Sequence, residues 1–340
     1  MGLKREEREV LKKFIIDNVD NMPKQIAVQT AKKFGISRQA VHGHISGLIK
    51  RGVLESVGKG NTIQYFLKKQ IKKIPLDLTQ HIEEHTVWLK QVFPFLPQLP
   101  SNIVEICNYG VCEMLNNVID HSESKTAYIQ ISISVKSITF CVVDQGVGIF
   151  NKIQKHLNLS TPQHAILELA KGKFTSDPDR HSGEGIFFTS RMFDEFYIWS
   201  EKLCFYGHID DDWIFDSGHE EKGTFVLMRI KRDNKNSIKE VFDTYTLDEI
   251  EGGFSKTIVP VRLLQHEGEE LVSRSQAKRL IVRFDRFKEV LLDFNGVKII
   301  GQAFADEIFR VFKKTHPQVH LTPIGTNEAI KQMIGHVLNS

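Results

Sequence analysis

A carboxylate and a carboxamide stand four residues apart in the stretch Glu113-Met-Leu-Asn-Asn117. We predict one helix over residues 101–122, and positions four apart share one face of a helix. Glu113 could orient and deprotonate a water molecule. Asn117 could hold a magnesium ion, which prefers hard oxygen ligands. The pair therefore predicts a catalytic base beside a metal ligand.

A second set of candidates begins where an apolar strand ends. The predicted strand over residues 138–143 runs directly into Asp144-Gln-Gly146-Val-Gly148. An acid at the end of a strand, followed by two glycines, suits a buried carboxylate that contacts a base while the chain turns closely around a ligand. We therefore expect these three residues to bind the ligand together.

Two glycines also open a predicted helix over residues 186–193, in the stretch Gly183-Glu-Gly185. Backbone N–H groups and the helix dipole at such a position favour anions, so these glycines are candidates for phosphate binding. Polar residues near these motifs complete the candidate set: Lys173 and Thr175, which precede the glycines, and Thr224, which opens a predicted closing strand.

In this order and spacing, the four motifs resemble those of gyrase B, the Hsp90-type chaperones, histidine kinases and MutL-type repair proteins, the GHKL superfamily of ATPases. The histidine-kinase and anti-sigma-factor-kinase branch is the most similar. The resemblance implies ATP and Mg²⁺ as ligands. It also implies an α/β sandwich over residues 78–232, in which helices cover one face of a mixed sheet.

Roles for single residues follow from the same resemblance. Glu113 corresponds to the catalytic base, Asn117 to the magnesium ligand and Asp144 to the aspartate that binds adenine. The other matched positions contact the nucleotide: Gly146, Gly148, Gly183, Gly185 and Thr224. Lys173 and Thr175 fall in the segment that corresponds to the lid, where they are candidates for phosphate contacts.

The first 70 residues predict a separate module of three helices and a hairpin. We expect the helices over residues 4–17, from Pro23 onward and from Arg38 onward, and the hairpin strands over 53–57 and 62–67. Pro23 suits a first helical turn, and Ser37 is a good N-cap for the third helix. That helix is polar at its start and apolar at its end, as expected if one end enters a DNA groove.

This pattern resembles the bacterial winged helix-turn-helix regulators over residues 5–68. The resemblance implies contacts to DNA from the third helix and from the hairpin tip: Arg38, Gln39, His42, His44 and Lys59. Residues 1–74 hold 16 basic and 6 acidic side chains, whereas the remainder is mildly acidic, so a polyanion partner is expected for this segment only. Docking on a protein is the alternative. We interpret residues 68–73 as a basic linker.

The last segment, residues 256–340, alternates predicted strands and helices, which indicates a small α/β unit. Strands are expected over 257–264, 290–294 and from Val319, and helices over 275–284, 302–315 and 327–338. The segment resembles STAS-like domains, a class that includes anti-sigma-factor antagonists. The strand–helix junction at residues 297–303 lacks the phosphate-accepting serine of those antagonists. We therefore expect a protein-docking or dimerisation role.

The composition sets outer limits. The chain has 340 residues, 41% of them hydrophobic and 26% charged, as in ordinary soluble proteins. It has no apolar run of the ~18 residues that a membrane span needs, and no secretion signal at its start. Its four cysteines form no CxxC motif and are expected to be reduced in the cytoplasm.

Together these features predict an α+β multidomain, ATP-responsive bacterial regulator that binds DNA. An anti-sigma-type protein serine kinase fused to its regulator, and a nucleotide sensor that does not hydrolyse ATP, are the alternatives. A homodimer is left open.

Overall fold

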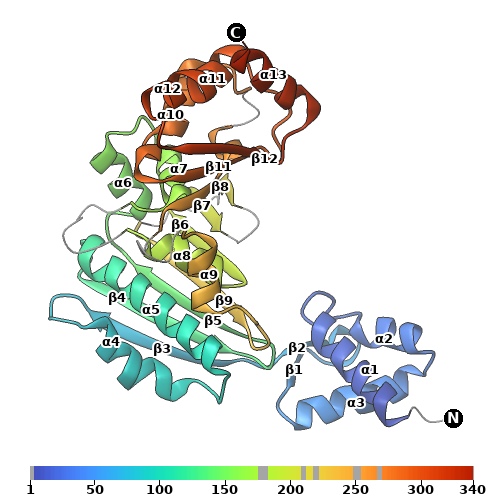
Figure 1. The fold of residues 1–340 in the computed structure, drawn as a ribbon. Coiled ribbons are helices and arrows are strands. Elements are labelled where there is room, and N and C mark those ends of the chain that lie inside the picture. The colour runs from blue at the N-terminus through green and yellow to red at the C-terminus, as the bar shows by residue number, and fades with distance from the viewer. Residues whose placement is uncertain are drawn as a thin grey trace. The chain divides into compact units, whose positions relative to one another are not determined.

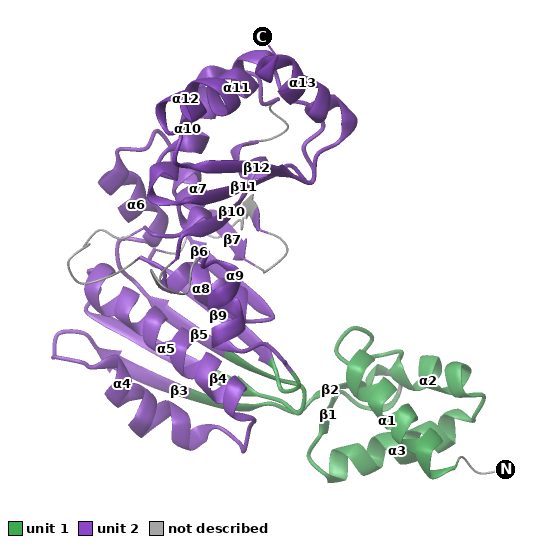
Figure 2. Ribbon diagram, viewed as in Figure 1, with its two compact units in different colours: residues 1–72, 131–139, 231–233 green, residues 73–130, 140–230, 234–340 purple. Residues whose placement is uncertain are grey.

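The computed structural model describes residues 4–174, 183–207, 212–216, 222–247, 254–265 and 270–339. The chain divides into two compact units (Figure 2). The first unit contains residues 1–72 together with 131–139 and 231–233. The second unit contains the rest of the chain.

Three helices and a two-stranded hairpin account for most of the first unit (Figure 1). Their bounds are α1 (Arg5–Asn18), α2 (Ile26–Phe34), α3 (Arg38–Lys50), β1 (Leu54–Val57), a short 3₁₀ turn η1 (Gly60–Thr62) and β2 (Gln64–Leu67). The hairpin is antiparallel, with Leu54 opposite Leu67. The predicted order of three helices and a hairpin is confirmed.

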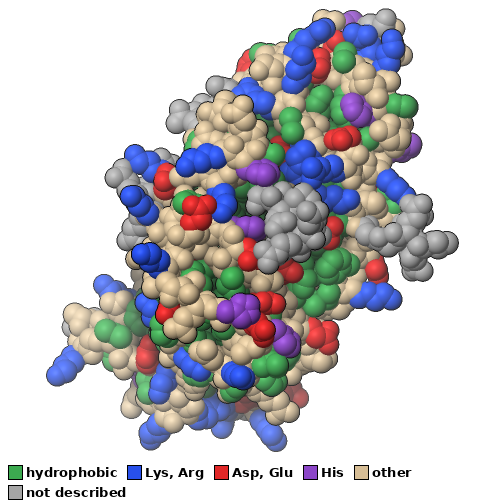
Figure 3. Space-filling model, turned by 90° about the vertical axis from the view of Figure 1, so that its left-hand side faces the viewer, with side chains coloured by type: hydrophobic (Ala, Val, Ile, Leu, Met, Phe, Trp, Pro, Cys, Tyr) green, Lys and Arg blue, Asp and Glu red, His purple; other side chains and the backbone are tan. Residues whose placement is uncertain are grey.

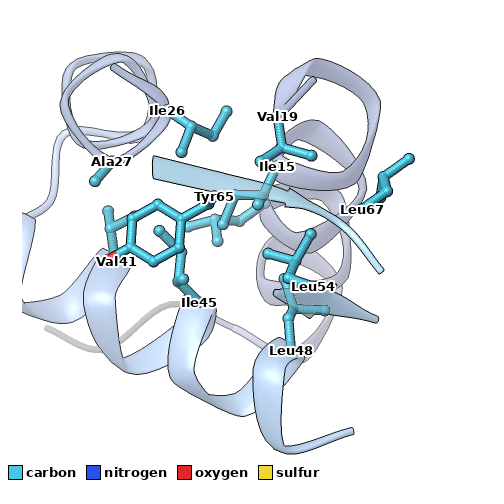
Figure 4. Packing of buried hydrophobic residues seen from close by; sticks show 11 residues of the cluster. Ile15, Val19, Ile26, Ala27, Val41, Ile45, Leu48, Leu54, Tyr65 and Leu67 are labelled. Carbon is cyan, nitrogen blue, oxygen red and sulfur yellow. The ribbon is translucent and has the colours of Figure 1, made fainter. Parts of the chain in front are cut away.

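An apolar cluster holds these elements together (Figure 4). Ile15 of α1, Val41 and Ile45 of α3 are buried, and the ring of Tyr65 from β2 lies among them. The turn between α2 and α3 follows the sequence signals. Gly35 has a φ of 64°, which favours glycine, and the Ser37 hydroxyl accepts a hydrogen bond from the Ala40 N–H at 3.2 Å.

A seven-stranded sheet is the main feature of the second unit. Short parts of its strands and turns, residues 131–139 and 231–233, group with the first unit instead. The strand order is β3-β4-β5-β9-β6-β7-β8, and the pairs from β9 to β8 are antiparallel. The bounds are β3 (Gln70–Asp77), β4 (Thr126–Ile133), β5 (Ser137–Asp144), β6 (Glu195–Ser200), β7 (Leu203–Gly207), β8 (Trp213–Asp216) and β9 (Phe225–Lys231).

Strand β3 corrects the prediction of a basic linker over residues 68–73. From Gln70 onward the chain is an edge strand, with Ile74 and Leu76 buried at alternate positions. Pro75 is tolerated because a strand at the edge of a sheet does not need every N–H for pairing. Lysines at such an edge also discourage pairing with other chains, which explains why the strand has the composition of a solvated linker.

The helices of the second unit lie between and after these strands along the chain (Figure 1). They are α4 (Glu84–Val87) with its π and 3₁₀ continuations η2 (Trp88–Val92) and η3 (Phe93–Phe95), α5 (Ser101–His121), α6 (Ile149–Leu157), α7 (Gln163–Lys171), α8 (Gly185–Met192) and α9 (Ile238–Thr244). The predicted helices over 101–122 and 186–193 correspond to α5 and α8. The α+β class is confirmed.

Residues after 254 form a parallel three-stranded sheet with helices against it, in the order β10-β11-β12. The elements are β10 (Lys256–Pro260), η4 (Val261–Leu264), α10 (Arg274–Ile281), η5 (Phe284–Arg286), β11 (Glu289–Asp293), α11 (Gln302–Asp306), η6 (Glu307–Phe312), α12 (Lys313–Thr315), β12 (His320–Ile324) and α13 (Glu328–Leu338). The predicted strand over 257–264 ends at Pro260, since proline has no N–H with which to continue the ladder.

Aromatic side chains of the segment between the two sheets pack against α8. Phe242 of α9 stacks on Phe188 with 4.0 Å between ring centroids. Tyr245 and Phe254, both buried, pack against Phe187 with centroid distances of 4.9 and 4.5 Å. These contacts tie the inter-domain segment to a helix of the central domain.

No helix among the described residues is long and apolar enough to cross a bilayer. On the face shown in Figure 3, basic and acidic side chains are interspersed.

Candidate functional site

A cavity of about 340 Å³ lies where α5, α6, α8, β5 and β9 meet. This volume is within the usual range for small-molecule sites. Seven of the residues predicted from the sequence line the cavity, and they come from four separate segments: Glu113, Asn117, Asp144, Gly148, Gly183, Gly185 and Thr224. The motifs that are distant in sequence therefore converge on one site.

Asp144 ends β5 with only 4% of its surface exposed. Its carboxylate accepts a hydrogen bond from the Gly146 N–H at 2.8 Å and others from the backbone N–H and the hydroxyl of Thr224. Burial raises the pKa of this carboxyl group above its usual value, and the hydrogen bonds oppose that shift. An ionised carboxylate has about four acceptor sites, so this group, which lines the cavity, can also accept a hydrogen bond from a ligand.

The turn after Asp144 needs its glycines for close packing. A Cβ atom on Gly146 would lie 1.8 Å from the Ser122 carbonyl oxygen, which accepts the Val147 N–H at 2.9 Å. Gly148 has a φ of 77°, and a Cβ there would lie 2.5 Å from the Ser200 hydroxyl. The turn therefore packs directly against the end of α5, which brings Asp144 beside the helix that carries Glu113 and Asn117.

Glu113 and Asn117 lie one turn apart on the face of α5 that lines the cavity, as their spacing predicts. A Cβ atom on Gly185 would lie 2.0 Å from Oε2 of Glu113. The first residue of α8 therefore lies directly against the Glu113 carboxylate, which would have to turn away to make room for a larger residue.

Three predicted residues are not among those that line the cavity: Gly146, which packs against Ser122, Lys173 and Thr175. Thr175 lies outside the described residues. The ammonium group of Lys173 donates to the Arg286 carbonyl oxygen at 3.0 Å and lies 5.1 Å from the ring centroid of Phe287. A phosphate contact by Lys173 stays a prediction, and this placement of its ammonium group does not support it.

The cavity also has walls that the sequence analysis missed. Lys152 and His156 of α6 line it, together with Phe174. Lys152 donates to the His121 carbonyl oxygen at 2.7 Å and pairs with Glu123 at 3.1 Å. The signal was available, because Ile149, Lys152, Ile153 and His156 recur at helical spacing directly after Gly148.

The donor set fits magnesium held with a nucleotide. Among the described residues, no group of three or more His, Cys, Asp and Glu side chains could hold a metal ion by itself. Magnesium usually keeps several waters and takes one or two protein oxygens together with substrate phosphates. Asn117 lines the cavity, and its side chain carries an oxygen of the kind that magnesium accepts.

Cysteine chemistry is not part of this site. All four cysteines are free, and Cys112 adjoins Glu113. Burial raises the pKa of Cys112 to about 12 and that of Cys141 to about 11. These thiols are therefore protonated, and poor nucleophiles, near neutral pH.

The residues predicted to contact DNA do not all share one surface. The side chains of Arg38, Gln39 and His42 are exposed. Since each residue of a helix turns by about 100°, these three lie within about 100° of one another around α3. Lys59 is exposed in the hairpin. His44 lies on the other side of α3, where burial, followed by the charges of Lys12 and Arg8, lowers its pKa.

Two family models match the chain. Residues 74–204 match the model described as a histidine kinase-like ATPase domain, and residues 276–331 match the model described as a STAS-like domain of unknown function. No curated protein matches the sequence. The chain therefore contains a histidine kinase-like ATPase domain and a C-terminal STAS-like domain. This pairing fits an ATP-binding regulatory protein, with the STAS-like domain suited to protein interactions.

Proposed function

We propose that this chain is a regulator that binds Mg-ATP in the cavity between α5, α6 and α8 and contacts DNA through its N-terminal unit. The observation that carries the proposal is the convergence of Glu113, Asn117, Asp144, Thr224 and the glycine at position 185 on one cavity inside the histidine kinase-like domain.

Each side chain has a role that its chemistry supports. The buried Asp144 carboxylate accepts a hydrogen bond from the exocyclic amine of adenine. The Asn117 oxygen is a ligand for Mg²⁺, which neutralises phosphate charge. The N–H groups that open α8 at Gly185 are suited to bind a phosphate group. Glu113, held beside Gly185, is placed to orient a water molecule and accept its proton.

Asp144→Asn is expected to weaken ATP and ADP binding by about 10- to 100-fold, because the amide cannot reproduce the acceptor that a buried carboxylate offers. Folding stability at neutral pH should be retained or increased. The pKa of Asp144 is raised by burial, so its ionisation opposes folding above that pKa, and asparagine removes this cost.

Calorimetric titration with Mg-ADP and urea denaturation test both statements. Asp243→Asn is the matched control, since Asp243 is exposed on α9. If Asp144→Asn bound ADP like the wild type, the proposed adenine contact would be wrong. ATP affinity of the wild type should also fall as the pH drops through the raised pKa of Asp144.

A protein kinase of the anti-sigma type is the second candidate, favoured by the STAS-like domain that follows the ATPase domain. Incubation with γ-labelled Mg-ATP separates the candidates. Free phosphate that is lost in Glu113→Gln indicates hydrolysis, and labelled protein indicates phosphotransfer. Binding with neither product indicates a nucleotide sensor.

The N-terminal unit is proposed to be a winged helix that binds DNA through α3 and the hairpin. Arg38→Ala is expected to weaken binding to duplex DNA and to reduce its salt dependence by about one counterion. His44→Ala should bind like the wild type, because His44 lies on the opposite side of α3. Fluorescence anisotropy over a salt series measures both effects. Binding that does not depend on salt would count against phosphate contacts.

A further inference from the structure

The segment that joins α7 to the cavity bends sharply. Gly172 and Lys173 have φ values of 78° and 53°, both in the left-handed region. A lysine adopts this conformation only when surrounding contacts hold it there. The next residue, Phe174, donates its N–H to the Gly183 carbonyl oxygen at 3.1 Å, and both residues line the cavity. The bend therefore sets the position of one cavity wall.

Side chains of the C-terminal domain hold this bend. Arg283 donates to the Gly172 carbonyl oxygen at 2.8 Å, and Arg286 donates to the Lys173 carbonyl oxygen at 3.1 Å. The Lys173 ammonium group returns a hydrogen bond to the Arg286 carbonyl oxygen. Each of the two residues of the bend thus accepts a hydrogen bond from an arginine of the C-terminal domain.

The end of α7 just before the bend is anchored in the same way. The Lys171 ammonium group, fully buried, donates to Glu168 at 2.5 Å and to the Val282 carbonyl oxygen at 3.0 Å. Arg283 reaches the second carboxylate oxygen of Glu168 at 2.8 Å. The Thr257 hydroxyl donates to the Lys171 carbonyl oxygen at 2.8 Å. These contacts fix the bend at both of its ends.

Arg283 also contacts the cavity wall itself. Its guanidinium carbon lies 5.5 Å from the ring centroid of Phe174, within the range of a cation–π contact. The same ring packs edge-on against His156 at 5.9 Å, and His156 lines the cavity. One aromatic ring therefore separates Arg283 from the cavity.

We propose that Arg283 and Arg286 are positioning residues for nucleotide binding, so that the C-terminal domain completes the ATP site by holding the bend at Gly172 and Lys173. This inference rests on the proposed binding of nucleotide in the cavity. Coupling between two sites is reciprocal. Bound nucleotide must therefore favour the arrangement in which the C-terminal domain contacts the bend. A partner protein that moves these arginines away from the bend must lower the affinity for nucleotide.

Mg-ADP titration of the full-length protein tests the inference. Arg283→Ala should weaken binding by about tenfold or more, and Arg286→Ala by a few-fold, within the usual range of coupling between sites. Arg310→Ala is the control, because Arg310 is an exposed arginine of the same domain that pairs with Asp306. It should bind ADP like the wild type. Arg283→Lys keeps a cation and should bind with intermediate affinity, which covers the case in which Arg283→Ala does not fold.

Hydrogen exchange supplies a readout that a purely structural role would not move. ADP should slow exchange at residues 283–290 of the wild type, although none of them lines the cavity, and at saturating ADP this protection should be smaller in Arg286→Ala. Wild-type affinity in both Arg286→Ala and Arg283→Lys, with exchange at 283–290 unaffected by ADP, would overturn the inference alone. Failure of the wild type to bind ADP would overturn the proposed function as well.

Discussion

Gly146→Ala is expected to lower the free energy of unfolding by more than about 3 kcal/mol, at the upper end for single substitutions. The added Cβ atom would lie 1.8 Å from the Ser122 carbonyl oxygen and 2.6 Å from its carbon. Both are backbone atoms at the end of α5 and cannot rotate away as a side chain could. Nucleotide binding should be lost too, since the turn and Asp144 must move together.

Urea denaturation followed by circular dichroism measures this effect. Gly335→Ala is the matched control, because Gly335 lies within α13 of the same unit and a Cβ atom there meets nothing within 4 Å. Alanine at that position should stabilise by up to about 1 kcal/mol through its higher helix propensity. Similar unfolding midpoints for the two variants would contradict the inference that Gly146 packs too closely on Ser122 to accept a Cβ atom.

Glu168→Gln is expected to lower the free energy of unfolding by about 3–5 kcal/mol, because breaking a buried ion pair leaves the other partner charged and uncompensated. Glu168 is 2% exposed and is bonded to both Lys171 and Arg283, so its loss leaves two buried cations without their carboxylate. The effect should be far larger than any change at an exposed pair, which contributes about 0–1 kcal/mol.

The chain offers a matched control for this substitution. Glu328 and Lys331 form an ion pair with the same spacing of three residues, but both are exposed. Glu328→Gln should leave the midpoint of urea denaturation almost unchanged. Equal effects of the two substitutions would contradict the role assigned to burial.

The loss of folding stability caused by Glu168→Gln should also become smaller as the pH rises. Burial lowers the pKa of Lys171, so the unfolded chain binds more protons than the native chain at alkaline pH. Stability rises with pH wherever the unfolded state binds more protons. Without Glu168, Lys171 can release its proton and the uncompensated charge disappears. A deficit that grows between about pH 7 and pH 9 would contradict this explanation.

Much of the candidate site could be predicted from the sequence because its motifs are local. The four-residue spacing of Glu113 and Asn117, and the glycines after Asp144, are fixed by helix and turn geometry that short stretches encode. The helices of the first unit were found for the same reason. Ser37 and Gly35 mark their ends with residues whose backbone preferences are strong.

What the sequence could not provide depends on contacts between distant segments. Strand β3 was missed because its lysines have the composition of a linker, and only pairing with β4 makes it a strand. The side chain of Lys173 was expected near phosphates but lies against Arg286, more than a hundred residues away in the chain. His44 was grouped with His42 because only Gly43 separates them in the sequence. Residues two positions apart on a helix nevertheless point to nearly opposite sides, since each residue turns by about 100°.

The aromatic contacts of the inter-domain segment limit where the chain can be divided. Phe187 and Phe188 are buried by Phe242, Tyr245 and Phe254, which follow the ATPase domain in sequence. A fragment truncated near residue 232 would expose these rings to water and invite aggregation. The histidine kinase-like domain is therefore not independent of the segment that follows it, and engineered fusions or gene rearrangements that keep these rings buried must carry the chain through Phe254.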